Sequence, residues 1–115
     1  MAGWLDRMDR HVDQGAWKDA DLTAKPSDYF RRQCWISFEP VEGSLPYLVD
    51  YLGADRILWA TDYPHGDGFP GAPALIGNMP GLSSENTRRI LAEGAIRFYN
   101  MGSPDELMAS ASGAP

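Results

Sequence analysis

Two apolar segments with a helix between them constrain the fold of this chain most. Residues 34–38 and 57–61 are rich in β-branched and aromatic side chains and have the length of strands. Residues 45–52 carry leucines and a valine at helical spacing, after a serine cap and before a glycine. Strands joined through such a helix run parallel, because the crossover returns the chain to the same end of the sheet. The sequence therefore predicts an α/β fold with two parallel strands.

Two helices are predicted before the first strand. An amphipathic helix begins almost at the first residue, and its apolar stripe consists of Trp4, Leu5, Met8 and Val12. A shorter helix starts at Pro26 or Ser27 and leads into residues 34–38. That strand lacks polar alternation, so we expect it to be buried on both faces.

Two more helices are predicted after the second strand. A short one lies near residues 74–78, and a longer one begins at Ser83 or Ser84. The apolar stripe of the longer helix consists of Ile90, Leu91, Ala95 and Phe98. Gly94 interrupts this helix at a cost of about 1 kcal/mol relative to alanine. Residues 1–101 thus form the folded part, and the Ala-, Ser- and Gly-rich residues 102–115 are expected to be a disordered tail.

Charge and composition limit the partners of the chain. The formal net charge is -6, which argues against binding to a nucleic-acid backbone. No apolar stretch approaches the roughly 20 residues that span a bilayer, so no membrane partner is expected. Cys34 is the one cysteine and has no intrachain disulfide partner. We therefore expect a soluble, cytoplasmic protein.

Candidate functional residues gather after the second strand. Asp62 directly follows residues 57–61, and His65 lies in the glycine-rich loop beyond it. Loops at strand ends carry catalytic side chains in α/β enzymes, so Asp62 is the candidate catalytic residue. Its alternative role is an Asx turn that caps the strand end. His65 either contacts substrate or stabilises the turn, and the sequence leaves both readings open.

Other polar and aromatic residues near the strands are given structural roles. Asp67 is expected to be solvated. Glu39 leaves the first strand toward the same edge of the sheet, but Glu-Pro is ordinary turn sequence, and we favour that role. The side chains expected in the core include Cys34, Trp35 and Trp59.

Three ordered motifs resemble one protein family. They are KPSDYFRRQCWISFEP at residues 25–40, LGADRILWATDYPH at residues 52–65 and PGLS at residues 80–83. The series closely resembles the C-terminal end of the amidohydrolase-related family. These proteins are metal-dependent (β/α)₈ TIM-barrel hydrolases and decarboxylases, and aminocarboxymuconate semialdehyde decarboxylase-like proteins are among them. The resemblance runs from about Trp4 to Tyr99.

The resemblance implies a fold and a site. Residues 34–38 and 57–61 would be the seventh and eighth barrel strands of a C-terminal barrel fragment with flanking helices. Asp62 would be the aspartate that faces a catalytic divalent metal, zinc or manganese, and handles the proton of its bound water. The implied function is a hydrolase acting on a small-molecule substrate. A decarboxylase of the same family is the alternative, and the sequence does not separate the two.

The chain departs from the family in its metal ligands. The His-x-His pair of the first barrel strand has no counterpart, because the two histidines are His11, on a helix, and His65. One aspartate cannot hold a zinc ion that prefers about four ligands. We therefore expect Asp62 to belong to an incomplete site, the isolated chain to be inactive, and no metal to be bound by this chain alone.

An incomplete barrel has consequences for how this chain arose and for whether it associates with other chains. Met1 falls immediately before a mid-barrel helix, which suggests a truncated or mis-started piece of a longer barrel. Unpaired strand edges would let such a piece associate with itself or with another chain as a non-catalytic fragment. A relic without selected activity is the remaining alternative.

Overall fold

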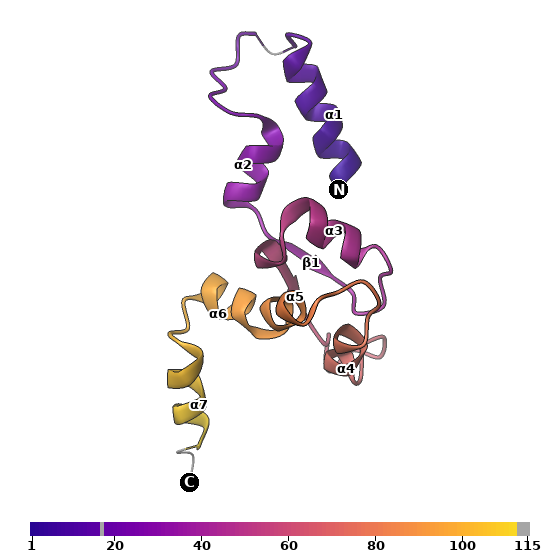
Figure 1. Cartoon of the computed structure of the whole chain (residues 1–115), viewed down its shortest axis with the longest axis vertical. Helices are drawn as coiled ribbons and strands as arrows, with labels where there is room; N and C mark the ends of the chain where they lie inside the picture. Colours follow the sequence, from indigo (N-terminus) through magenta and orange to yellow (C-terminus); the bar gives the residue numbers. More distant parts are fainter. Residues whose placement is uncertain (17, 113–115) are drawn as a thin grey trace. The chain divides into compact units, whose positions relative to one another are not determined.

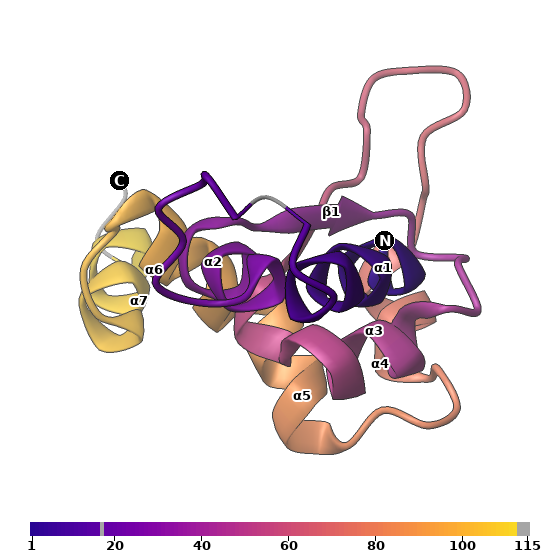
Figure 2. The same ribbon diagram turned by 90° about the horizontal axis from the view of Figure 1, so that it is seen from above.

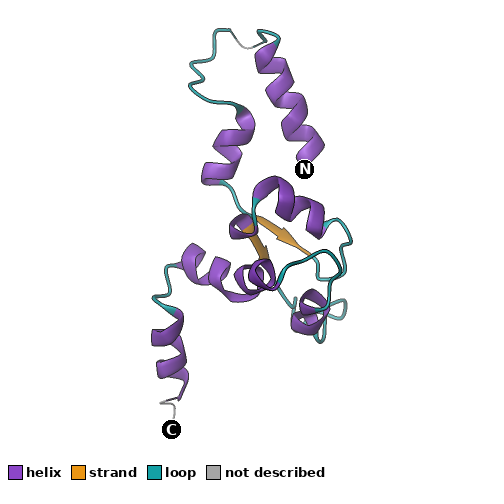
Figure 3. Cartoon of the chain, viewed as in Figure 1, coloured by secondary structure: helices purple, strands orange, loops and turns teal. Residues whose placement is uncertain are grey.

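The computed structural model describes residues 1–16 and 18–112, and they divide into two compact units. The first unit comprises residues 1–35 and the second begins at residue 36. Figure 1 labels the helices and strands along the chain, and Figure 3 distinguishes them by colour. None of the helices in the described part is both long and apolar enough to cross a membrane.

The first unit is a pair of helices, α1 (Ala2–Asp13) and α2 (Pro26–Gln33). The Asp9 carboxylate in α1 accepts hydrogen bonds from the backbone N–H of Ser27, at 2.9 Å, and from its hydroxyl. Arg31 donates to the same hydroxyl, so buried Ser27 has its polar atoms satisfied. These bonds join the start of α2 to the middle of α1.

The predicted apolar stripe of α1 is only partly buried. Leu5 is buried, whereas the Trp4 side chain is 64% exposed. Both residues line an apolar groove of about 520 Å³ within the first unit, together with side chains of α2 such as Phe30. The eight-residue α2 is too short to cover the whole stripe.

The second unit contains the predicted strand, helix and strand. They are β1 (Ile36–Phe38), α3 (Leu45–Leu52) and β2 (Ile57–Trp59), with a 3₁₀ turn η1 (Ala54–Arg56) before β2. The strands pair in parallel, and Ile36 lies opposite Ile57. The α/β fold with two parallel strands is therefore confirmed. β1 begins two residues later than predicted and β2 ends two residues earlier, because the ladder starts where Ile36 meets Ile57 and stops where Phe38 meets Trp59.

Helices cover one face of this small sheet. Figure 2 shows α3, α4 (Ala72–Gly77) and α5 (Ser84–Arg88) on the same side of β1. The core cluster consists of Phe38, Leu45, Val49, Ala54, Ile57, Ile76 and Ile90. On the other face Ser37 is exposed, so the prediction of a strand buried on both faces is wrong.

Three residues assigned to the core are only partly buried. Trp59 packs against the core cluster and donates from its indole nitrogen to the Leu91 carbonyl at 3.3 Å. Cys34 and Trp35 precede β1 and are half-buried. Their partial exposure has the same physical origin as that of Ser37, because residues flanking a short two-stranded sheet have few covering neighbours.

The long helix near the end of the second unit changes its geometry along its length. It comprises α5, a π-helical stretch η2 (Arg89–Glu93) and α6 (Gly94–Tyr99). The Ser83 hydroxyl accepts the Asn86 N–H at 3.1 Å, which confirms the predicted cap. Ile90 is fully buried, but the Phe98 side chain is 46% exposed and packs edge-on against Tyr99. The predicted buried stripe thus ends before Phe98.

Gly94 lies where this helix approaches β2 most closely. A Cβ atom at this position would be 3.1 Å from the carbonyl oxygen of Arg89 and 3.3 Å from that of Ile57. Both neighbours are backbone atoms, which move less easily than the end of a side chain. Gly94 is therefore a packing residue of the helix–strand contact and not merely a weak point of the helix.

Replacing Gly94 with alanine should lower the free energy of unfolding. Alanine gains about 1 kcal/mol of helix propensity, but crowding in a packed site typically costs about 1–3 kcal/mol. Gly77→Ala is the matched control, because a Cβ on this helical glycine meets nothing within 4 Å. Urea denaturation should give a lower midpoint for Gly94→Ala and an equal or higher one for Gly77→Ala. Equal gains in both variants would contradict the packing role.

The end of the described chain is helical where the sequence predicted a disordered tail. Helix α7 covers Pro104–Ser112, and residues 113–115 lie outside the described part. Ser103 accepts the N–H of Glu106 at 3.2 Å, and the Glu106 carboxylate accepts the N–H of Ser103 at 2.6 Å. This reciprocal capping box, with Pro104 at the first helical position, starts the helix despite the small residues that follow.

Candidate functional site

Asp62 stands at the carboxyl end of β2, three residues beyond the last paired residue. Its backbone adopts a φ of 56°, in the left-handed region that aspartate tolerates better than most residues. The Thr61 hydroxyl accepts the N–H of Tyr63 at 3.3 Å. The Asp62 carboxylate lies 3.2 Å from Nδ1 of His65. The strand end thus directs an acid and an imidazole toward each other.

Backbone hydrogen bonds close the loop that carries these residues. The N–H of His65 donates to the Asp62 carbonyl at 2.9 Å, and the N–H of Gly68 donates to the His65 carbonyl at 3.1 Å. The N–H of Phe69 then returns to the Thr61 carbonyl at 2.8 Å. A Cβ at Gly68 would lie only 2.9 Å from that carbonyl oxygen, so the closure requires glycine. In Figure 2 this rose-coloured loop extends away from the helices.

The closed loop brings three potential metal ligands together. Asp62, His65 and Asp67 each offer one ligand atom, and these atoms lie within 4.8 Å of one another. One imidazole nitrogen and two carboxylate oxygens form a donor set that suits zinc or manganese. The three residues therefore fit a divalent ion as part of its coordination. All three are exposed, with 52% of the Asp62 side chain and 69% of the His65 side chain accessible to solvent.

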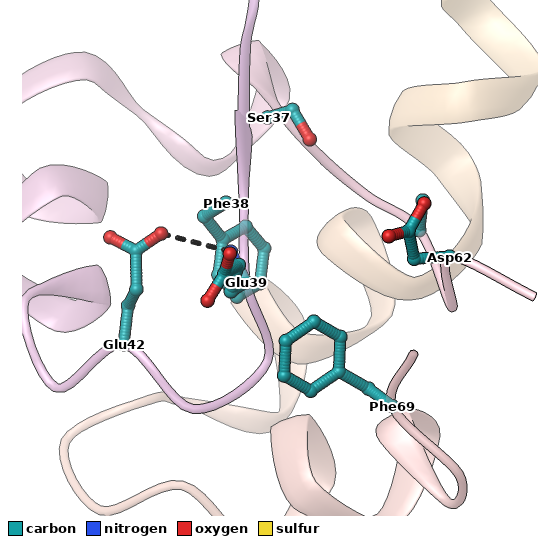
Figure 4. Close-up of a pocket in the computed structure, with 7 residues that line it drawn as sticks. Ser37, Phe38, Glu39, Glu42, Asp62 and Phe69 are labelled. Carbon is teal, nitrogen blue, oxygen red and sulfur yellow. Dashed lines mark hydrogen bonds between the residues drawn. The ribbon is translucent and has the colours of Figure 1, made fainter. Parts of the chain in front are cut away.

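A pocket opens between the ends of β1 and β2. It has a volume of about 330 Å³ and is lined by Ser37, Phe38, Glu39, Glu42, Ala60, Asp62 and Phe69. Figure 4 shows Asp62 and Phe69 entering from the chain around β2, whereas Glu39 and Glu42 come from the chain after β1. The Glu39 N–H donates to the Glu42 carboxylate at 2.9 Å. Three acidic residues and two phenylalanines thus line one space.

The candidate residues differ in whether they line the pocket. Asp62 lines the pocket and also belongs to the three-ligand group, whereas His65 belongs only to that group among the described contacts. Glu39 makes the turn that the sequence predicted and lines the pocket as well. Glu42 and Phe69 were missed, although both lie in loops after strands, where barrel enzymes collect functional residues.

This chain is similar to known proteins along most of its length. The family model described as Amidohydrolase matches residues 3–101. The 5-carboxyvanillate decarboxylase LigW from Sphingomonas paucimobilis is similar in structure, with a TM-score of 0.71 and 29% sequence identity. An amidohydrolase from Mycobacterium avium subsp. paratuberculosis K-10 has a TM-score of 0.66 at 24% identity, a likeness of fold alone. No match is found among curated proteins.

The matched structures are much longer than this chain. The LigW match covers 87% of this chain and 30% of LigW, and the mycobacterial match covers 81% of this chain and 23% of that protein. The parallel strands and their helices therefore correspond to part of a TIM barrel. The family match spans most of the described residues, as the motifs predicted. The chain belongs to the amidohydrolase family.

Proposed function

We propose that this chain supplies the C-terminal part of a metal-dependent amidohydrolase-type hydrolase that acts on a small molecule. Asp62 is its metal-facing catalytic carboxylate. The observation that carries the proposal is the position of Asp62, which leaves the carboxyl end of a parallel strand and lines a pocket with Glu39 from the neighbouring strand end. Active sites of TIM barrels lie at this end of the strands.

The chemistry of Asp62 follows from its surroundings. A bound divalent ion supplies a Lewis acid and lowers the pKa of a coordinated water toward neutrality. The Asp62 carboxylate can accept a proton from such a water at one oxygen. The His65 imidazole, whose Nδ1 lies 3.2 Å from Oδ2 of Asp62, orients that carboxylate by hydrogen bonding. In this proposal His65 also contacts the substrate.

Decarboxylation is the second candidate reaction. It is favoured by the 29% identity to LigW, whose name specifies decarboxylation of 5-carboxyvanillate. Phe69, half-buried in the pocket wall, offers a flat apolar surface for an aromatic substrate of that kind. The identity of the reaction rests on residues that shape the remainder of the pocket, and most of the barrel of LigW lies outside the matched segment.

The isolated chain is expected to be inactive in this proposal. Its pocket is lined by acidic residues from two strand ends, and the described part places one histidine, His65, beside Asp62. A non-catalytic role, in which the chain associates through the unpaired edges of β1 and β2, remains the alternative. Size-exclusion chromatography with light scattering separates the two, because a stable folded monomer would leave the association role without support.

A chimera with LigW tests the proposed metal-facing role of Asp62 directly. The part of this chain that matches LigW would replace the corresponding LigW segment. We expect the folded chimera to bind a divalent metal and to decarboxylate 5-carboxyvanillate, because the other barrel strands then complete the ligand set. Circular dichroism checks folding, elemental analysis measures metal, and chelation should abolish turnover. A chimera that folds but retains no metal would contradict the assignment of Asp62 to the metal site.

A further inference from the structure

The Glu42 side chain lines the pocket, but its carboxylate is bound to the turn that follows β1. One carboxylate oxygen accepts the N–H of Glu39 at 2.9 Å, and the other accepts the Ser44 hydroxyl at 3.4 Å. We propose that Glu42 is a positioning residue of the candidate active site and holds Glu39 in the pocket wall on the β1 side. The inference rests on the proposed function, because the pocket is the one that Asp62 lines.

The Glu39 N–H needs a partner because the strand ladder has ended. The last pair of the parallel ladder joins Phe38 to Trp59, one residue earlier. A backbone N–H beyond the end of a ladder is satisfied by a side chain or by water. Here the Glu42 carboxylate supplies the partner, and a hydrogen bond to an ionised acceptor is stronger than one to a neutral group.

Hydrogen bonds in both directions close the turn between Glu39 and Glu42. The N–H of Glu42 donates to the Glu39 carbonyl at 2.9 Å, so the two residues exchange hydrogen bonds as in a capping box. Between them Pro40 is fully buried, whereas Val41 is 61% exposed. Figure 4 shows the Glu42 carboxylate directed at the Glu39 backbone. Glu42 thus fixes the direction in which the chain leaves β1, and with it the place of the Glu39 side chain.

The other side of the pocket is held by separate hydrogen bonds. Asp62 follows β2, and the loop beyond it is closed by the bond from the Phe69 N–H to the Thr61 carbonyl. Loss of the Glu42 carboxylate should therefore displace the β1 side of the pocket and leave Asp62 in place. The kinetic signature of such a change is weaker substrate binding with little change in the chemical step.

Kinetics of the LigW chimera test the positioning role. Glu42→Ala should raise KM for 5-carboxyvanillate about three- to tenfold, the range of one lost hydrogen bond, and should leave kcat within a factor of about two. Glu42→Gln should restore most of this loss, because its amide oxygen can accept the same N–H. Asp50→Ala removes an exposed carboxylate from α3 and is the matched control, with KM and kcat unchanged. Circular dichroism checks the folding of each variant.

Hydrogen exchange on the full chain tests the bond itself and needs no turnover. In ¹⁵N-labelled protein the Glu39 amide should exchange at least about threefold faster in Glu42→Ala than in the unmodified chain, with Glu42→Gln between them. The Gly53 amide, bonded to the Val49 carbonyl at 2.9 Å, is the internal reference and should keep its rate. An unchanged Glu39 rate in Glu42→Ala would overturn the proposal.

Two kinetic results in an active chimera would also overturn it. One is an unchanged KM in Glu42→Ala, and the other is a Glu42→Gln variant as impaired as Glu42→Ala. Failure of the proposed function gives a different result, because the unmodified chimera would then fold without metal or turnover. The exchange rates of the full chain would still decide whether Glu42 fixes the turn.

Discussion

Replacing Asp62 with asparagine in the LigW chimera should lower kcat by about 10²–10⁴-fold, the range of a lost general acid or base. Asparagine has nearly the shape of aspartate and accepts the left-handed backbone that Asp62 adopts at φ 56°. The fold and the loop closure should therefore survive. What is lost is the negative charge and the oxygen that takes up a proton.

The control for this variant is Asp50→Asn in the same chimera. It makes the same chemical change at an exposed residue of α3 and should leave kcat within a factor of about two, since isolated surface substitutions have small effects. Steady-state decarboxylation of 5-carboxyvanillate and metal content would be measured for both. A kcat for Asp62→Asn within tenfold of the unmodified chimera would reject a catalytic role for this residue.

Replacing Ile57 with alanine should cost the second unit about 2–5 kcal/mol of unfolding free energy, as large-to-small core changes do. Ile57 is fully buried, pairs with Ile36 across the sheet and belongs to the core cluster. Domains typically have about 5–15 kcal/mol in total, and a core of this size lies near the low end. The alanine variant should therefore lose much of its cooperative unfolding transition.

A graded series makes the Ile57 result interpretable. Ile57→Val should cost only about 0.5–1.5 kcal/mol, because it removes one methylene group. Val41→Ala removes aliphatic surface from a residue that is 61% exposed, and it should change the unfolding midpoint little. Circular dichroism during urea denaturation reports all three. Equal midpoints for Ile57→Ala and Val41→Ala would show that Ile57 does not support the core.

The order of the elements could be predicted from the sequence because helical spacing and strand composition are local signals. Leu45, Val49 and Leu52 were expected to face the core, and all three are buried. The strand lengths could not be predicted in the same way, because each strand extends only as far as its partner, here from Ile36 opposite Ile57 to Phe38 opposite Trp59. Helix α7 was not predicted, because the Ala-, Ser- and Gly-rich composition of residues 102–115 outweighed the short capping signal of Ser103 and Glu106.

The sequence predicted Asp62 as a candidate site residue, but it did not predict which other side chains lie near it. Asp62 follows an apolar strand, and strand ends are where such sites form. The proximity of Asp67 depends on the hydrogen bond between the Phe69 N–H and the Thr61 carbonyl, a backbone contact that no side-chain pattern encodes. Glu42 reaches the pocket for a similar reason, since a tight turn after β1 brings its carboxylate to the Glu39 N–H.

The π-helical stretch η2 has a consequence for changes in chain length. A wide turn of this kind accommodates one extra residue while the helix on each side keeps its orientation. Deleting one residue from Arg89–Glu93 should convert the wide turn into an ordinary one, with Ile90 and Gly94 still directed at their partners. A deletion in α5 rotates the following residues by about 100° about the helix axis and turns Gly94 away from Ile57. The helix should therefore tolerate the loss of a residue at one place and not at its neighbours.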